Sequence, residues 1–432
     1  MKTKTMQIKD NKLYLGSFSL EELADKFGTP LYVYDEVHMR NKISRYVNNF
    51  KDDKYDCKIV YATKAFLAPY LVQILKEYGV YADAVSGGDL YLLEQSGYPM
   101  NMVVLHGNNK SIAELEMAIE KGVGYIVVDN VSELQDLIEL TNKRKTLVKT
   151  LFRVNPGVEA HTHTFIQTSL LDSKFGESIF DLSTIDQIMM LYKNSQYVTL
   201  DGFHAHIGSQ ISDGKSFVKL VEVMAKFIKE VEDKYQMKMS TLDLGGGFGI
   251  KYLDDDKEIN VEEAVKLILD AVHQEFNGLG LSIKNLMIEP GRSIVGDSGI
   301  TIYRTHRIKH TYAGVDYAFI DGGMPDNIRP SLYQAKYTVI NASRVEGEKN
   351  VYNIAGKCCE SGDMIAKGVE ITKPLCDDIL CVFSTGAYCY SMSMNYNGLT
   401  RPGVIFVNED KITEAIRKET YEELVKTCNF KF

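Results

Sequence analysis

The stretch Lys58-Ile59-Val60-Tyr61-Ala62-Thr63-Lys64 sets the pattern for most of this chain. A short apolar run ends on a lysine, and residues 66–75 then carry apolar side chains at helical spacing. A brief apolar run before a helical period predicts a buried strand of an α/β protein. Lys64 stands at the carboxyl end of that strand, where α/β sheets hold their ligands. Most lysines are solvated surface charges, so a functional role for Lys64 is indicated only if other functional residues are predicted beside it.

The same alternation of apolar runs and helical patterns continues as far as residue 288. We expect eight strands, at residues 59–62, 80–84, 102–105, 125–128, 148–154, 198–203, 241–244 and 286–288. Eight strands that alternate with helices over roughly 250 residues are typical of an α/β fold of the (β/α)8 TIM-like barrel type. A doubly wound sheet is the alternative, and it is disfavoured because no Gly-x-Gly-x-x-Gly follows the first strand.

The pattern of residue types changes after Gly299. Short β-rich runs separated by Gly, Pro, Asn and Asp occur at residues 300–308, 317–320, 335–340, 350–355, 378–384 and 404–407. They predict a C-terminal all-β domain, sandwich- or barrel-like, closed by a helix near residues 419–427. A single hydrophobic core rarely grows beyond ~250–300 residues, so we divide the 432 residues. Residues 1–35 form an N-terminal segment that packs with the β domain, 36–297 form the barrel, and 298–432 form the β domain.

Composition excludes several classes of partner. The chain has 49 Lys and Arg against 58 Asp and Glu, a net charge of −9, which argues against nucleic acid or an anionic membrane. No apolar run approaches the roughly 18 residues of a membrane span, and the first seven residues lack the apolar segment of a secretory signal. The seven cysteines form no Cys-x-x-Cys pair, so a reduced, cytoplasmic protein is expected.

Four groups of polar residues follow predicted strands. In a (β/α)8 barrel the catalytic residues sit at the carboxyl ends of the strands, and a phosphate site commonly follows strands seven and eight. Lys64 ends strand one, residues 204–210 follow strand six, 245–249 follow strand seven, and 289–292 follow strand eight. All four groups are therefore expected on one rim of the barrel.

The chemistry of these groups points to one cofactor. Consecutive glycines at residues 245–247 let backbone N–H groups turn toward an anion, although a tight turn alone explains them equally well. Glu289 could form a structural ion pair with Arg292, or it could hold a protonated heterocyclic nitrogen. A lysine for a Schiff base, a phosphate cradle and a carboxylate for a ring nitrogen are together what pyridoxal 5′-phosphate requires.

His204 and His206 support a rival interpretation. Residues two apart in a strand share a face, and a His-x-His pair can bind a metal ion. A metal-dependent barrel hydrolase is therefore an alternative from another functional class. Further ligands are hard to find in the sequence, however, and Gly208-Ser209 beside His206 suits a planar ligand with a phosphate. We predict no metal site.

Short motifs along nearly the whole chain occur in one specific order. They lie at residues 61–64, 172–176, 204–210, 245–249, 289–292, 321–324, 329–333, 359–363 and 386–388. In these motifs the chain resembles the diaminopimelate decarboxylases, which are pyridoxal phosphate enzymes with an alanine-racemase-like barrel and a C-terminal β domain. The resemblance implies decarboxylation of meso-2,6-diaminopimelate to L-lysine, the last step of that biosynthetic route.

The resemblance also implies roles for residues at the cofactor. Lys64 would form the Schiff base, His206 would stack on the ring, and Glu289 would meet the pyridine nitrogen. The remaining residues expected to hold the cofactor are Ser209, Gly246, Gly247, Gly291, Arg292 and Tyr388.

Further roles concern the substrate. Arg292, Arg329 and Tyr333 would grip its distal carboxylate, Glu360 would pair with its distal ammonium group, and Tyr388 would touch it as well. Cys359 would donate a proton across the interface of a homodimer with shared active sites. Without the family resemblance, we would interpret Arg329 and Glu360 as an ordinary surface ion pair. We would interpret Cys359 as a buried thiol of the core.

Related pyridoxal phosphate enzymes remain as alternatives. Ornithine and arginine decarboxylases act on substrates without a distal carboxylate, so the arginine–tyrosine set argues against them. Carboxynorspermidine decarboxylase is harder to exclude. An alanine racemase has no use for a clamp on a distal carboxylate, and a non-catalytic carrier of the cofactor is a more distant alternative.

Overall fold

The computed structural model describes residues 3–158 and 173–430 and divides into two compact units. The barrel unit comprises Ile43–Gly249 and Lys257–Gly291, and the β unit comprises Met1–Lys42, Ile250–Asp256 and Arg292–Phe432. Residues 36–42, 250–256 and 292–297 therefore cluster with the β unit, whereas the sequence prediction placed all of residues 36–297 in the barrel. Within the described residues, none of the helices combines the length and apolar character needed to span a bilayer.

Eight parallel strands pair into a closed ring in the barrel unit. They are β5 (Asp56–Tyr61), β6 (Tyr81–Ala84), β7 (Val103–Leu105), β8 (Tyr125–Val128), β9 (Val148–Asn155), β11 (Val198–His204), β12 (Thr241–Asp243) and β13 (Asn285–Ile288). Each strand pairs with the next in this order, and β13 returns to β5 with Met287 opposite Lys58. The predicted (β/α)8 barrel is confirmed, and the two-residue strand β10 (Glu177–Ser178) pairs with the last two residues of β9.

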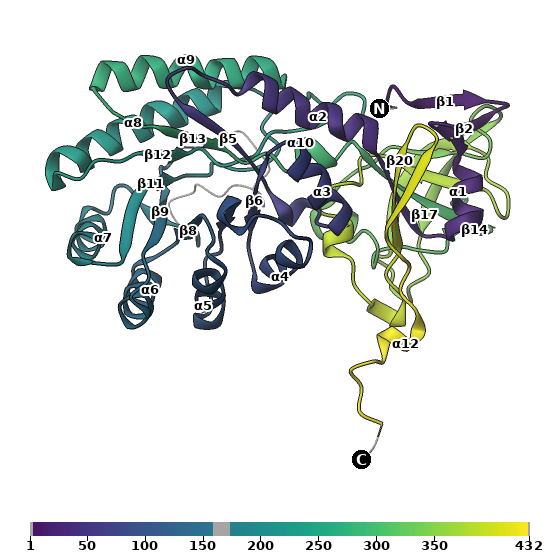
Figure 1. The fold of residues 1–432 in the computed structure, drawn as a ribbon. Coiled ribbons are helices and arrows are strands. Elements are labelled where there is room, and N and C mark those ends of the chain that lie inside the picture. Colours follow the sequence, from purple (N-terminus) through teal and green to yellow (C-terminus); the bar gives the residue numbers. More distant parts are fainter. Residues whose placement is uncertain (1–2, 159–172, 431–432) are drawn as a thin grey trace. The chain divides into compact units, whose positions relative to one another are not determined.

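Helices flank the strands of the barrel (Figure 1). They are α2 (Glu36–Asn49), α3 (Pro69–Glu77), α4 (Gly87–Gln95), α5 (Ile112–Lys121), α6 (Val131–Arg144), α7 (Leu182–Asn194), α8 (Lys215–Tyr235) and α9 (Val261–Leu279). Local signals set their ends: Ser111 and Glu114 form a reciprocal capping box before α5, and Gly122 ends that helix at φ 65°. An N-cap of this kind stabilises a helix by about 1 kcal/mol.

Apolar side chains fill the centre of the barrel. Val60, Val104, Val127, Leu151 and Met287 come from five different strands and form one buried cluster. A barrel interior packed in this way is a core and not a pore. Ligands are consequently left to the rim, where the carboxyl ends of the strands meet.

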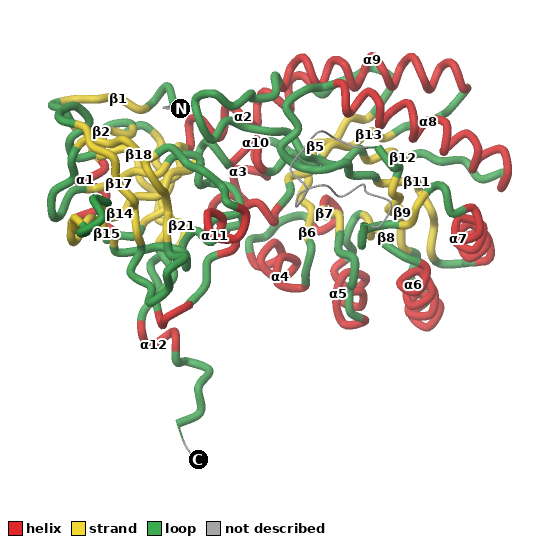
Figure 2. Tube along the Cα trace, turned by 180° about the vertical axis from the view of Figure 1, so that it is seen from behind, coloured by secondary structure: helices red, strands yellow, loops and turns green. Residues whose placement is uncertain are grey.

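The β unit is built on a mixed sheet. Its strands are β4 (Leu31–Asp35), β14 (Gly299–His310), β15 (Asp316–Ile320), β16 (Val339–Asn341), β17 (Lys349–Ala355), β18 (Met364–Thr372), β19 (Ile379–Val382), β20 (Gly403–Asn408) and β21 (Lys411–Ile416). β4 pairs antiparallel with β14 and parallel with β20, so a strand from the N-terminal segment lies inside the sheet. Figure 2 draws the strands of this unit in yellow, among them β14, β15, β17, β18 and β21.

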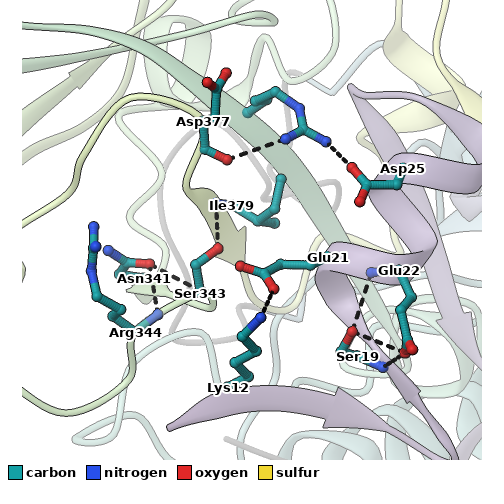
Figure 3. Close-up of polar contacts among 11 residues, drawn as sticks. Lys12, Ser19, Glu21, Glu22, Asp25, Asn341, Ser343, Arg344, Asp377 and Ile379 are labelled. Atoms are coloured by element: carbon teal, nitrogen blue, oxygen red, sulfur yellow. Dashed lines mark hydrogen bonds and ion pairs between the residues drawn. The ribbon is translucent and has the colours of Figure 1, made fainter.

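The rest of the N-terminal segment also packs within the β unit. β1 (Met6–Lys9), β2 (Lys12–Leu15) and β3 (Phe18–Ser19) form a small sheet before α1 (Leu20–Phe27). Figure 3 shows the cap between Ser19 and Glu22 and the ion pair between Lys12 and Glu21. Exposed ion pairs contribute ~0–1 kcal/mol each, so most of the attachment comes from Leu13, Leu20 and similar residues in the shared apolar core.

The elements of the β unit that were not predicted include the strands β1, β2, β3, β18 and β21 and the short helix α11 (Arg329–Tyr333). In α11, Pro330 stands at a position that favours a helix start. The predicted strand at residues 335–340 is correct only near its end, since β16 begins at Val339. The closing helix exists as α12 (Tyr421–Leu424), and α10 (Arg292–Val295) follows the barrel strands.

Candidate active site

Lys64 lies in a 3-10 turn, Thr63–Ala65, that follows β5. The carboxylate of Asp83, on β6, accepts hydrogen bonds from the backbone N–H of Thr63 at 2.7 Å and from its hydroxyl at 3.0 Å. Thr63 and Ala65 are buried, whereas the side chain between them is exposed. Burial raises the pKa of Asp83 to about 6, and the charge of Lys64 opposes that shift. Asp83 therefore fixes the turn that presents the lysine.

The glycine run after β12 is packed too closely for any side chain. A Cβ on Gly246 would lie 2.1 Å from the carbonyl oxygen of Glu289, and one on Gly247 would lie 2.3 Å from that of Gly208. Gly247 also has φ +109°, a backbone conformation that other residues rarely adopt. The backbone N–H of Ile211 donates to the carbonyl of Gly247 at 2.8 Å. The loops after β11 and β12 are thus held together, as a phosphate cradle at this rim requires.

His206 extends from the loop after β11 and is oriented by the same glycine run. The backbone N–H of Gly246 donates to its Nδ1 at 3.2 Å, so this nitrogen is an acceptor. Burial lowers the pKa of His206 well below its usual value, and the positive charges of Lys64 and Arg153 act in the same direction. A neutral imidazole with a fixed ring is suited to stacking on a planar ligand.

Glu289, directly after β13, lies at the centre of a buried cluster. Its Oε1 is 2.6 Å from Nε2 of His106, and its Oε2 is 3.3 Å from Nε2 of His204. Burial alone would raise the pKa of Glu289, but His106 and His204 outweigh burial and hold the pKa well below its usual range. Burial and the charge of Glu289 raise the pKa of the neighbouring Asp243 well above its usual value. Glu289 is therefore the ionised member of the two carboxyl groups.

Gly291 allows the segment after β13 to pack closely against the segment after β5. A Cβ at this position would lie 2.7 Å from the Cβ of Ala62, two residues before Lys64. The barrel unit thus gathers Lys64, His206, Ser209, Gly246, Gly247, Glu289 and Gly291 on the carboxyl ends of β5, β11, β12 and β13. Of the motif at residues 172–176, Asp172 lies outside the described residues.

Sequence reasoning missed several members of this cluster. Asp83, His106 and Asp243 were not assigned, although each lies at or directly after the end of a predicted strand. Arg153 on β9 was missed as well; its guanidinium lies 4.0 Å from Asp129. The strand-end rule that located Lys64 and Glu289 could have located the first three.

The same cluster has the donor types of a metal site. Donor atoms of His106, His204, Asp243 and Glu289 lie within 4.8 Å of one another. The sequence alternative paired His204 with His206, yet His206 is not a member of this group. The prediction that the site binds no metal remains a prediction.

The remaining predicted residues belong to the β unit, and two arginines are prominent among them. Arg292 is buried, hydrogen-bonds through Nη1 to the hydroxyl of Tyr252, and lies with its guanidinium carbon 4.7 Å from the ring centre of Tyr388. Arg329 donates from Nε to the hydroxyl of Tyr337 at 2.8 Å. Burial would lower the pKa of Arg329, but Tyr337 and neighbouring groups raise it above its usual value. Both arginines are therefore cations held in place by tyrosine side chains.

Arg329 and Tyr333 are the first and last residues of α11. The guanidinium carbon lies 5.4 Å from the ring centre of Tyr333 and 5.7 Å from that of Tyr388. Two tyrosine rings and a hydroxyl partner restrict the arginine to a narrow set of positions. The predicted arginine–tyrosine set is therefore assembled within the β unit.

Cys359 and Glu360 lie in the exposed loop between β17 and β18. Asp363 shapes this loop by accepting a hydrogen bond from the backbone N–H of Cys358 at 2.7 Å, and Asn397 accepts one from that of Cys359, also at 2.7 Å. Burial and Asp363 raise the pKa of the Cys358 thiol to about 12. Of the two adjacent cysteines, Cys359 is the exposed one.

Comparison with known proteins identifies the family. Residues 38–296 match the family described as "Pyridoxal-dependent decarboxylase, pyridoxal binding domain". The chain is 42% identical to the diaminopimelate decarboxylase of Bacillus subtilis, over 96% of this chain and 94% of that protein. It belongs to the diaminopimelate decarboxylase family.

Other diaminopimelate decarboxylases agree in sequence and in fold. The Staphylococcus aureus member is 40% identical over 96% of this chain and 97% of its own length. The crystal structure of the M. jannaschii member in co-complex with L-lysine superposes with a TM-score of 0.92 at 32% identity, covering 99% of this chain and 98% of that one. Membership makes pyridoxal 5′-phosphate the cofactor and the chain a decarboxylase, so the metal-dependent hydrolase is set aside.

The barrel residues fit this cofactor. The approach of His106 to Oε1 of Glu289 is close but lacks the geometry of a hydrogen bond, so this buried oxygen retains acceptor capacity for a ring N–H. A Cβ on Gly246 or Gly247 would collide with the carbonyl oxygen of Glu289 or Gly208, so only glycine allows the backbone of these loops to pack this closely at the rim. Glycine-rich backbone of this kind suits a bound phosphate. Lys64 lies on the same rim with an exposed side chain.

Proposed function

We propose that this chain converts meso-2,6-diaminopimelate to L-lysine and carbon dioxide, the final step of L-lysine biosynthesis. One observation favours this substrate over ornithine and arginine: Arg329, a held cation, is flanked by Tyr333 and Tyr388. A planar fork of donors suits a second carboxylate, which ornithine and arginine lack. The relatives that match over the full length are named for the same substrate.

The residues predicted to hold the cofactor have separate tasks in this proposal. Lys64 supplies the amine that anchors it, and His206 lies against the ring. Ser209, Gly246, Gly247, Gly291 and Arg292 bind the phosphate end together with the ring, and Tyr388 makes a further contact. Glu289 accepts a hydrogen bond from the ring nitrogen and keeps it protonated. When bound, pyridoxal phosphate accepts the electron pair that the departing carboxylate leaves behind.

Residues of the β unit recognise the substrate and complete the reaction. Arg292, Arg329 and Tyr333 bind the distal carboxylate, Glu360 pairs with the distal ammonium group, and Tyr388 lines the site. The bond to the leaving carboxylate breaks, and Cys359 gives its thiol proton to the carbon that lost it. The Cys359 sulfur then regains a proton from solvent. Binding both distal charges costs desolvation, which paired partners of opposite sign offset.

The test of this function is the release of carbon dioxide by the holoenzyme from separate substrates: the stereoisomers of diaminopimelate, ornithine, arginine and carboxynorspermidine. We expect release from meso-diaminopimelate, with L-lysine as the second product. A preference for carboxynorspermidine, the alternative that the sequence leaves open, would overturn the assignment. The same assay in the presence of a chelator tests the prediction that the site binds no metal, because activity that survives chelation does not depend on a bound metal ion.

We further propose a cytoplasmic homodimer in which Cys359 and Glu360 serve the partner's site; the exposure of their loop supports this arrangement. Mixing Lys64→Ala and Cys359→Ala subunits should restore about a quarter of the wild-type activity, because half of randomly mixed two-fold dimers carry one intact site. The measurement is activity after subunit exchange, with exchange monitored by differently tagged chains. Exchange without any recovery would place Lys64 and Cys359 of one site on the same subunit.

A further inference from the structure

Glu289 is held by two buried histidines, one on each carboxylate oxygen. His106 contacts Oε1 at 2.6 Å and His204 contacts Oε2 at 3.3 Å. Both histidine side chains and the carboxylate are almost fully buried, with exposed fractions of 7%, 1% and 7%. An ionised carboxylate at such depth is costly unless neighbouring groups compensate its charge. The two imidazoles are the polar groups that contact its two oxygens.

Each histidine is fixed by the barrel itself. The backbone N–H of His106 donates to the carbonyl of Ala84 at 2.7 Å, continuing the pairing of β7 with β6. His204 is the last residue of β11 and stands in register between Asp243 of β12 and Arg153 of β9. The two imidazole rings also meet edge to face, with centroids 4.9 Å apart and planes at 70°. The backbone of each histidine is thus fixed by strand pairing, and the two rings contact each other beside Glu289.

The charges in the cluster favour the same arrangement. Burial lowers the pKa of His204 to about 4, with Glu289 opposing the shift, so His204 is neutral near pH 7 and can donate from Nε2 to Oε2. His106 and His204 together keep the pKa of Glu289 well below its usual range despite burial. Asp243 faces the same carboxylate with its own pKa raised by burial. The group that remains anionic is the one between the histidines.

We propose that His106 and His204 are positioning residues for the reaction: each holds one oxygen of Glu289 and so fixes that carboxylate for the cofactor's ring nitrogen. The inference rests on the role proposed above for Glu289. A carboxylate has about four lone-pair sites, so two histidine contacts leave capacity for a ring N–H. Binding residues work best when further contacts fix their own geometry.

The direct test is the ring nitrogen itself. Holoenzyme reconstituted with pyridoxal phosphate labelled with 15N in the ring gives a 15N chemical shift that reports protonation of that nitrogen. In His106→Ala and His204→Ala we expect the shift to move toward that of unprotonated pyridine. His204→Ala loses a hydrogen bond to a charged group, so we also expect its kcat to fall about 10- to 100-fold, with KM for diaminopimelate little changed. His106→Ala loses a close polar contact with the same carboxylate, and its kcat should fall as well. Retention of both the wild-type shift and the wild-type kcat would overturn the inference.

Conservative variants separate positioning from a merely structural role. His106→Gln and His204→Gln keep an N–H donor near Nε2 and should recover much of the shift and of kcat. Asparagine keeps a polar side chain, but it is shorter than glutamine and places its N–H donor farther from Glu289. It therefore replaces alanine if an alanine variant fails to fold. The matched control is His273→Ala, which removes another histidine–carboxylate contact of the barrel unit. Nε2 of His273, in α9, lies 2.6 Å from Oδ2 of Asp52, in the segment before β5. That variant should keep the wild-type shift.

Glu289→Gln separates the inference from the proposed function. If this variant moves the 15N shift and the histidine variants do not, the inference fails while the role of Glu289 stands. If neither Glu289→Gln nor the histidine variants move it, the role proposed for Glu289 fails first. Movement in all three, with recovery in the glutamine variants, supports the assignment of both histidines.

Discussion

Lys64→Ala is expected to abolish the visible absorbance band of the bound cofactor and to lower kcat at least about 100-fold, the low end for a positioned group that transfers protons. The side chain is exposed on the rim, in a turn held by two hydrogen bonds to Asp83. Alanine removes the only amine of that turn and leaves the buried neighbours Thr63 and Ala65 in place. The fold should therefore be retained, so the loss of the absorbance band and of kcat should result from the missing amine.

The measurement combines an absorbance scan of the purified holoenzyme with carbon dioxide release from meso-diaminopimelate. Lys51→Ala is the matched control, because Lys51 is an exposed lysine of the same barrel unit, before β5 and away from the rim. An unchanged spectrum in Lys64→Ala would remove this lysine from the site. Loss of the band in Lys51→Ala as well would show that the assay reports folding instead.

Arg329→Ala should raise KM for diaminopimelate about 10- to 100-fold, the equivalent of about 1.5–3 kcal/mol for hydrogen bonds to a charged group. Its guanidinium is held by the hydroxyl of Tyr337 and by the rings of Tyr333 and Tyr388. Loss of the cation leaves the distal carboxylate without its partner when it is desolvated. Arg329→Lys keeps the charge but not the fork, so an intermediate KM is expected.

The control arms test specificity as well as affinity. Lysine carries no distal carboxylate. The ratio of kcat/KM for diaminopimelate to kcat/KM for lysine should therefore be smaller in Arg329→Ala than in the wild type. Arg307→Ala changes an exposed arginine of β14 and should leave KM as in the wild type. A normal KM in Arg329→Ala would exclude this arginine from the carboxylate clamp.

The sequence predicts the barrel well because its strands are buried on both faces and therefore read as continuous apolar runs. All eight runs became strands, and the strand-end rule placed Lys64, His206, Gly247 and Glu289 on one rim. That rule depends only on parallel pairing, which the alternation of strands and helices already implies.

The partners of Glu289 escaped prediction for a different reason. Several strand ends of the barrel carry polar residues, among them Asp83, His106, Asp129 and Asn155. Which of them converge on one carboxylate depends on side-chain directions around a closed ring, and a linear pattern does not contain this information. The contacts of His106 and His204 with Glu289 link residues 183 and 85 positions apart.

The β unit was predicted less completely because its elements carry weaker local signals. β18 lies at the edge of its sheet, where Lys367, Gly368 and Glu370 interrupt the alternation. The helix α11 has five residues, too few for a helical period to show, so Arg329 was predicted from the family resemblance and not from secondary structure.

The central position of β4 bears on how this protein is made. The ribosome releases residues 31–35 early, yet their partners β14 and β20 emerge only after the whole barrel has been synthesised. At ~5–20 residues per second, the roughly 260 intervening residues take about 10–50 s. During that time β4 is an apolar strand with two unpaired edges, which is a template for aggregation. Nascent chains stalled within the barrel should therefore recruit chaperones through their first 35 residues, well before the late β strands exist to cover them.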